Sequence, residues 1–360
     1  MIELRPGDDA DKPQILARTA EVFGAGPAQR METLWDWQWH HDPRLPSPGY
    51  RGVVAEWRGR VIGHLATIPA GLHIGGEPVR AWWFVDVLVH WGLVREAMRE
   101  QRRAGAPSRP DLSRGLAAAL FDHPIAGPIQ LGKHVSDQMS TIGRRIGFVP
   151  CADTGGAQRR ISVRHPVGRV LGARLGDLAG AVIDPLLGPN PRSGLSVRIH
   201  DGPFDGRFDA LWASVRGAFP AICRRDAALL DWRYRDCPDL DARVLILEQG
   251  GALRGYCVIR AFDRPGRPPR RLGKILDLLT APGDRIAQRA LLGGAIDALR
   301  RLRTERVECF YSGADLWHLL AEFGFAPKTT NSGRVRPLLT RHLPEAAKGI
   351  YITQGDGDGG

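Results

Sequence analysis

The chain has 360 residues, of which 43% are hydrophobic and 25% are charged, and its formal net charge is +11 at pH 7. This length exceeds that of one average domain, and the composition excludes a disordered chain. Most of the positive charge comes from Arg residues scattered through both halves, and no basic run is interleaved with aromatic residues. A nucleic-acid partner is therefore disfavoured, whereas an acidic small ligand or an acidic protein partner is favoured.

The cysteines and the N-terminus indicate the cellular compartment of the protein. Five cysteines form no Cys-x-x-Cys pair, which is typical of a reducing cytoplasm and gives no metal site: Cys151, Cys223, Cys237, Cys257 and Cys309. The N-terminus lacks the features of a signal peptide, and no apolar run approaches the ~20 residues of a membrane span. The sequence predicts a soluble, cytoplasmic protein with no membrane span.

The first half of the chain predicts strands and helices that alternate in an α/β sheet. In chain order these are a strand at 2–5, a helix at 10–23, a short Trp-rich helix, a strand pair turning at Gly59, an apolar strand with Asp86, a helix at 112–121, a strand at 128–132 and a helix ending at Gly147-Phe148.

The second half repeats this order, which indicates an internal repeat. Asp36-Trp37 returns as Asp231-Trp232, and Asp86 returns as Asp277. Further matches are Gly63 with Gly255 and Gly147-Phe148 with Gly324-Phe325. The predicted elements are a strand at 195–200, a helix at 204–216, a strand pair turning at Gly250-Gly251, an apolar strand, a helix at 286–303 and a strand at 306–311.

The repeat divides the chain into domains at 1–165 and 195–340. Residues 167–187, within the 166–194 linker, are apolar at helical spacing, which predicts an interdomain helix packed on both halves; a membrane-surface helix is the alternative. The Gly-rich residues 341–360 predict a flexible tail.

These motifs resemble the GNAT superfamily of N-acyltransferases. The matching features are the strand Val85-Asp86-Val87-Leu88-Val89-His90, the turn and helix start Ser113-Arg114-Gly115-Leu116-Ala117, the strand near Ile129 and the helix that ends at Gly147-Phe148. The resemblance implies two tandem GNAT-like domains, each a mixed, mostly antiparallel sheet flanked by helices. The Asp-Trp-x-aromatic segment and the Gly-Asp-rich end are similar to tandem GNAT-like proteins encoded near bacterial polysaccharide genes.

The resemblance also implies an acetyl-CoA or other acyl-CoA site in the first copy. Small residues let the backbone approach a phosphate, and free N–H groups of a helix start point at it. The residues implied to bind the cofactor are Val87, Leu88, Val89, Ser113, Arg114, Gly115, Leu116, Ala117 and Ser136. Leu112 departs from the family's leading Arg or Gln, and the second copy has Asp284 where the turn would stand.

Amide-forming acyl transfer needs a base, and three residues near the strands are candidates: Asp86, His90 and His134. The repeat of Asp86 as Asp277 favours a structural role for it, and His90 has an intrinsic pKa that suits a base. The family's usual acid is a Tyr, but its position here is Gly143 in the first copy and Leu320 in the second.

Residues 91–110 form an Arg-rich insertion beside the expected phosphate turn. We interpret it as a lid or partner contact, with an unstructured surface loop as the alternative. An acyl carrier protein is a candidate partner there, although free CoA is the preferred donor.

The sequence thus predicts an N-acyltransferase that transfers an acetyl or other acyl group to an amine of a small molecule or sugar precursor. The first alternative is a catalytically inactive tandem fold that binds or scaffolds other proteins. Aminoacyl transfer from charged tRNA is a further idea that only the basic charge favours.

Overall fold

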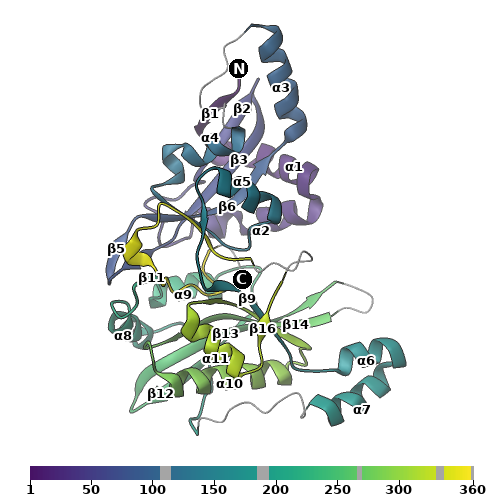
Figure 1. The fold of residues 1–360 in the computed structure, drawn as a ribbon, viewed down its shortest axis with the longest axis vertical. Helices are drawn as coiled ribbons and strands as arrows, with labels where there is room; N and C mark the ends of the chain where they lie inside the picture. The colour runs from purple at the N-terminus through teal and green to yellow at the C-terminus, as the bar shows by residue number, and fades with distance from the viewer. Residues whose placement is uncertain (106–114, 185–193, 266–269, 330–335, 358–360) are drawn as a thin grey trace.

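Two large mixed sheets, one above the other in Figure 1, organise the molecule. The computed structural model describes residues 1–105, 115–184, 194–265, 270–329 and 336–357. The first sheet has the strand order β1-β2-β3-β6-β7-β17-β8, and the second has the order β10-β12-β13-β14-β15-β9-β16. Helices flank both sheets, so the predicted α/β fold class is confirmed.

The elements of the first half follow the predicted order. They are β1 (Glu3–Pro6), α1 (Lys12–Phe23), α2 (Ala25–Trp39), β2 (Gly52–Trp57), β3 (Arg60–Pro69), β4 (Leu72–Ile74), β5 (Glu77–Val79), β6 (Ala81–Val89), α3 (Trp91–Arg103), α4 (Leu116–Asp122), β7 (Ile129–Gly132), α5 (Asp137–Arg145), β8 (Val149–Pro150) and β9 (Thr154–Arg160).

A helical hairpin, α6 (Arg164–Leu171) and α7 (Ala173–Ile183), leads to the second half. That half contains β10 (Arg198–His200), α8 (Gly206–Val215), β11 (Ala221–Cys223), α9 (Ala227–Tyr234), β12 (Ala242–Gln249), β13 (Ala252–Arg264), β14 (Arg270–Thr280), α10 (Arg285–Arg301), β15 (Arg306–Ser312), α11 (Ala314–Glu322), β16 (Ala326–Pro327) and β17 (Leu339–Arg341).

Successive side chains of a strand point to opposite faces of the sheet, so the first sheet packs against a hydrophobic core on each face. In β2, Val54 packs with Ile15 of α1, whereas its neighbours Val53 and Ala55 pack on the other face with the helices after β6. The predicted turn at Gly59 is confirmed: Arg58 and Gly59 have φ values of 53° and 71°, as a tight hairpin between twisted strands requires.

The two halves exchange strands. β9, from the first half, pairs with β15 and β16 in the second sheet. In return, β17 from the second half pairs with β7 and β8 in the first sheet. A boundary at residue 165 therefore leaves β9 with the first half of the chain, although β9 pairs in the second sheet.

Two tryptophans of the repeated motif meet between the halves. The rings of Trp37 and Trp232 stack with centroids 4.3 Å apart, and both side chains are buried. Each indole N–H donates to the other residue's carbonyl, at 2.7 and 2.9 Å. This reciprocal pair relates the two copies across their contact.

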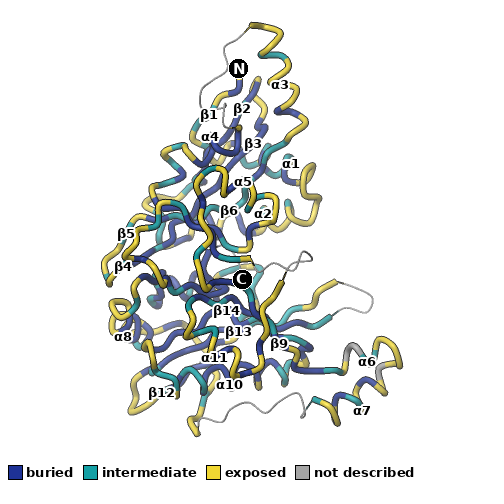
Figure 2. Tube along the Cα trace, in the orientation of Figure 1, coloured by how far each residue is buried: buried dark blue, intermediate teal, exposed yellow. Residues whose placement is uncertain are grey.

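The prediction of one buried interdomain helix at 167–187 is wrong. Gly172, with φ 91°, breaks the segment into α6 and α7, which pack on each other through close-set glycines such as Gly168 and Gly176. The hairpin extends away from both sheets (Figure 1), and its apolar side chains Val170, Leu178 and Val182 are 78%, 63% and 62% exposed. Figure 2 shows this hairpin as largely exposed.

Two segments, the insertion with its alternative of an unstructured loop and the predicted tail, are ordered where the structure describes them. Residues 91–103 of the Arg-rich insertion form α3, which buries Leu93, Val94 and Ala97 and exposes its arginines; Arg109 lies outside the described residues. The flexible-tail prediction is also wrong for residues 341–357, because Ile350, Ile352 and Asp356 are buried. Their burial places the C-terminal segment between the halves.

Candidate active site

The central strands of the first sheet separate to open a cleft. β6 pairs with β7 only from Ala81 to Trp83, and the two strands diverge after that point. A cavity of about 200 Å³ lies in the opening. Its walls are residues of β6, the chain after β7 and the start of α5: Trp83, Phe84, Val85, Asp86, Val87, Lys133, Val135, Ser136, Met139 and Gly357.

Asp86 lies at a bulge of β6. Leu65 pairs with Val87 and the next residue, Ala66, pairs with Val85, so Asp86 is the extra residue. Its φ of 41° is a left-handed value that Asp tolerates better than most residues. Asp86 also lines a second cavity of about 350 Å³, on the side of α1 and α2. It is therefore the residue at which the two cavities meet.

His64 lines this second cavity and pairs with the buried Tyr50, and sequence reasoning did not identify this pair as a site. His64 is 1% exposed, and its Nδ1 lies 3.2 Å from the hydroxyl of Tyr50. Within the described residues, its Nε2 has no hydrogen-bond partner. Burial lowers the pKa of His64 to about 4, so the ring is neutral at pH 7. Burial, and secondarily the charge of Asp86, raises the pKa of Tyr50 well above its usual range.

The repeat offered a signal for this pair. Gly63-His64 aligns with Gly255-Tyr256, and Tyr256 donates to Asp277 at 3.0 Å in the second half. In the first copy, the corresponding residues His64 and Asp86 both line the second cavity.

The other two candidate bases lie elsewhere. His90 caps α3 by accepting from the N–H of Leu93 at 3.2 Å, and its Nε2 lies 3.2 Å from Glu21. His134 contacts Gln354 Oε1 at 3.0 Å and lines a separate cavity between the halves. Desolvation of its ring, followed by nearby lysines, lowers the pKa of His134 to about 3, too low for an efficient base at neutral pH.

The residues implied to bind the cofactor divide into three groups. Val87 and Ser136 line the cleft, and Leu88 lines the second cavity, whereas Val89 continues β6 beyond both. Ser136 also caps α5, accepting from Met139 N–H at 3.1 Å. Ser113 and Arg114 lie outside the described residues.

The described part of the expected phosphate turn begins at Gly115. This residue has φ 92° and precedes α4, a helix of seven residues. Leu116 and Ala117 are buried, and Leu116 packs beside Gly63, next to the end of β6. α4 thus starts near the end of the strand that carries Asp86.

The positions of the family's Tyr hold no proton donor. Gly143 is buried in α5 against Phe148, and Leu320 is buried in α11. In the part of the chain that the structure describes, no group of three or more His, Cys, Asp or Glu side chains is placed to hold a metal ion.

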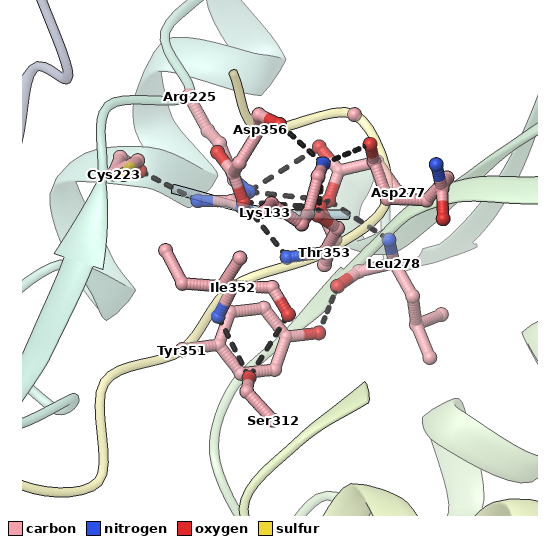
Figure 3. Close-up of polar contacts among 12 residues, drawn as sticks. Lys133, Cys223, Arg225, Asp277, Leu278, Ser312, Tyr351, Ile352, Thr353 and Asp356 are labelled. Carbon is pink, nitrogen blue, oxygen red and sulfur yellow. Dashed lines mark hydrogen bonds and ion pairs between the residues drawn. The ribbon is translucent and has the colours of Figure 1, made fainter. Parts of the chain in front are cut away.

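The C-terminal segment occupies the corresponding region of the second sheet (Figure 3). Gly355 N–H donates to the carbonyl of Leu276 at 2.6 Å, beside the bulge of β14. Asp277 accepts from Arg225 at 3.2 Å and from the hydroxyl of Thr353 at 3.0 Å. Asp277 is thus part of a buried network, whereas Asp86 lines two cavities.

The same segment reaches the first copy's cleft. The ammonium of Lys133 donates to the carbonyl of Thr353 at 3.1 Å and also to those of Gln354 and Asp356. Gly357 then lies against the ring of Trp83 and forms part of the cleft wall.

Solved structures of acyltransferases have a similar overall fold. One is a GCN5-related N-acetyltransferase from Anabaena variabilis, with a TM-score of 0.58 and 13% identity over 96% of this chain and 73% of that chain. The chain has the GNAT fold. Another is the Saccharomyces cerevisiae N-myristoyltransferase with bound myristoyl-CoA, with a TM-score of 0.52 and 11% identity over 94% of this chain and 82% of that chain.

A probable N-acyltransferase from Enterococcus faecalis also matches, with a TM-score of 0.53 and 10% identity over 95% of this chain and 72% of that chain. No protein-family model matches the sequence, and a search of curated proteins found no match. Among the described helices of this GNAT fold, none is both long and apolar enough to cross a bilayer.

Proposed function

We propose that the protein is an N-acyltransferase that uses acyl-CoA, with its single active site in the first copy. The observation that carries this proposal is the position of Asp86, at the meeting point of the β6–β7 cleft and the cavity beside α2. The cleft would hold the acyl and pantetheine part of the donor. Because β7 diverges from β6 after Trp83, the edge of β6 that faces the cleft can offer a backbone N–H to the thioester carbonyl.

The second cavity would hold the amine acceptor. Its walls include the buried side chains of Trp39 and Leu34, together with Gln38, whose amide nitrogen has no partner among the described residues. A cavity with apolar walls and a few unpaired polar groups is typical of a small-molecule site. We infer a small amine substrate with an oxygen or nitrogen atom that accepts a hydrogen bond from the Gln38 amide. A second polar group of this substrate would form a hydrogen bond with Nε2 of His64.

In this proposal Asp86 removes a proton from the acceptor ammonium, and the free amine attacks the thioester carbon. The C–N bond forms, the C–S bond breaks, and CoA leaves as a thiolate that takes up a proton. Asp86 is the base that the geometry favours, since His90 and His134 line neither cavity. Free CoA is the proposed donor, and an acyl carrier protein that binds the exposed arginines of α3 is the alternative.

The test is acetyl-CoA-dependent thiol release with a panel of amines and amino sugars. Asp86→Asn should lower kcat by roughly 100-fold or more while leaving acetyl-CoA binding intact, because it removes only the base. His90→Gln is the matched control and should change kcat by less than about threefold, since His90 caps α3 outside both cavities. Binding of acetyl-CoA without turnover of any amine would favour the inactive binding or scaffolding protein.

A further inference from the structure

A fourth cavity, of about 600 Å³, lies between the two halves beside the β4–β5 hairpin. It shares no lining residue with the two cavities at Asp86. Its walls come from the loop after α2, from the β4–β5 hairpin and the start of β6, and from α8 and the chain after β11. It is therefore a separate site to which both copies contribute.

Positive charge predominates around this cavity. Four arginines and one carboxylate line it: Arg44, Arg80, Arg216, Arg224 and Asp226. Arg224 pairs with Asp226, and Arg44 pairs with Asp42 behind the wall. Arg80 and Arg216 are exposed, and neither forms an ion pair within the described residues. The surplus of two guanidinium groups over carboxylates favours an anionic ligand.

Arg44 adds a second observation. Its side chain is only 2% exposed, and its two hydrogen bonds to Asp42, at 2.8 and 2.7 Å, use Nε and Nη2. Nη1 has no hydrogen-bond partner among the described residues. A buried guanidinium with an unused donor is costly unless a ligand or water satisfies it.

The rest of the wall is apolar and firmly held. Trp212 is 5% exposed and meets the ring of His73 edge-on at 5.2 Å. The guanidinium of Arg51 lies 3.9 Å from the centre of the Trp82 ring and fixes that indole. Leu72 and Val79 complete the wall. An inorganic anion would leave this apolar surface uncovered, so the ligand needs an apolar body as well as a charge.

We propose that this cavity binds an organic phosphate with an apolar ring, at a site separate from the acyl-transfer site. The phosphate would lie against Arg80 and Arg216, because each planar guanidinium can donate two parallel hydrogen bonds to two phosphate oxygens. The ring would cover the wall formed by Trp82 and Trp212. A ligand held in this way would contact both copies at once.

The probe is phenyl phosphate, titrated by calorimetry into the full-length protein. We expect saturable binding that weakens with salt, and inorganic phosphate should bind roughly tenfold more weakly or worse because it lacks the ring. The double variant R80Q/R216Q should weaken phenyl phosphate binding by roughly tenfold or more, whereas Ser136→Trp, a change in the β6–β7 cleft, should leave that affinity within about twofold.

R99Q/R102Q is the matched control, since it removes the same charge from the exposed face of α3. It should change the affinity by less than about twofold. The proposal is overturned by an absence of saturable binding, by equal weakening in the two double variants, by inorganic phosphate binding as tightly as phenyl phosphate, or by a comparable loss of affinity in Ser136→Trp.

Discussion

At the scale of single residues, two copies of one Asp have different surroundings. Asp277 is 2% exposed and is held by Arg225, Tyr256 and Thr353. Asp86 lies at the corresponding position, yet it lines two cavities. The repeat in the sequence correctly indicated that the positions correspond, but it favoured a structural role for both. The two positions differ in their contacts with the C-terminal segment. That segment bonds to Asp277 through Thr353, whereas in the first copy it forms part of the cleft wall through Gly357.

His64 predicts a pH dependence of stability. Burial lowers its pKa from 6.5 to about 4, so between these values the unfolded chain binds a proton that the folded protein does not. Stability is therefore lost as pH falls from 7 to 5, by about 2 kcal/mol from this residue. Urea unfolding of wild type and His64→Gln at both pH values measures this, and the variant should lose less stability on acidification. Equal losses in the two proteins would contradict the account.

At the scale of elements, the order of strands and helices was predictable, but their partners were not. Local patterns predicted the turn at Gly59 and the strand of Asp86, because glycine and apolar runs act over a few residues. The exchange of β9 and β17 depends on pairing between residues far apart in the chain, which no local pattern reports. The C-terminal segment was misjudged for the same reason: its glycines suggested mobility, whereas Asp356 is fixed by distant arginines.

The C-terminal segment should contribute substantially to stability. Asp356 is 1% exposed and accepts from Arg225 at 2.6 Å, with Arg233 3.5 Å away. Asp356→Asn removes the carboxylate that faces the buried guanidinium of Arg233 and leaves the buried Arg225 with Asp277 alone, which should cost about 3 kcal/mol or more in the free energy of unfolding. Lys348→Ala, which removes an exposed pair with Glu345, is the control and should cost less than about 0.5 kcal/mol. Chemical denaturation compares them, and similar small losses would refute the network.

At the scale of the whole molecule, the halves are interlocked, since each sheet contains a strand from the other half and Trp37 stacks on Trp232. Residues 1–165 expressed alone would lack β17, leaving β7 and β8 without the strand that joins them. We expect this fragment to be insoluble or to unfold without cooperativity, because unpaired inner strands expose backbone and apolar surface. Circular dichroism during thermal unfolding measures this, and a sharp cooperative transition would show that the first half is autonomous.

Calorimetric titration of acetyl-CoA is the most direct test of the central claim, that one acyl-CoA site lies between β6 and β7. We predict one molecule bound per chain, because the C-terminal segment fills the corresponding site of the second copy. Ser136→Trp should weaken binding by roughly tenfold or more by filling the cleft, whereas Thr141→Trp, on the exposed surface of the same helix, should stay within about twofold. An absence of binding, two molecules per chain, or unchanged affinity in Ser136→Trp would contradict the account.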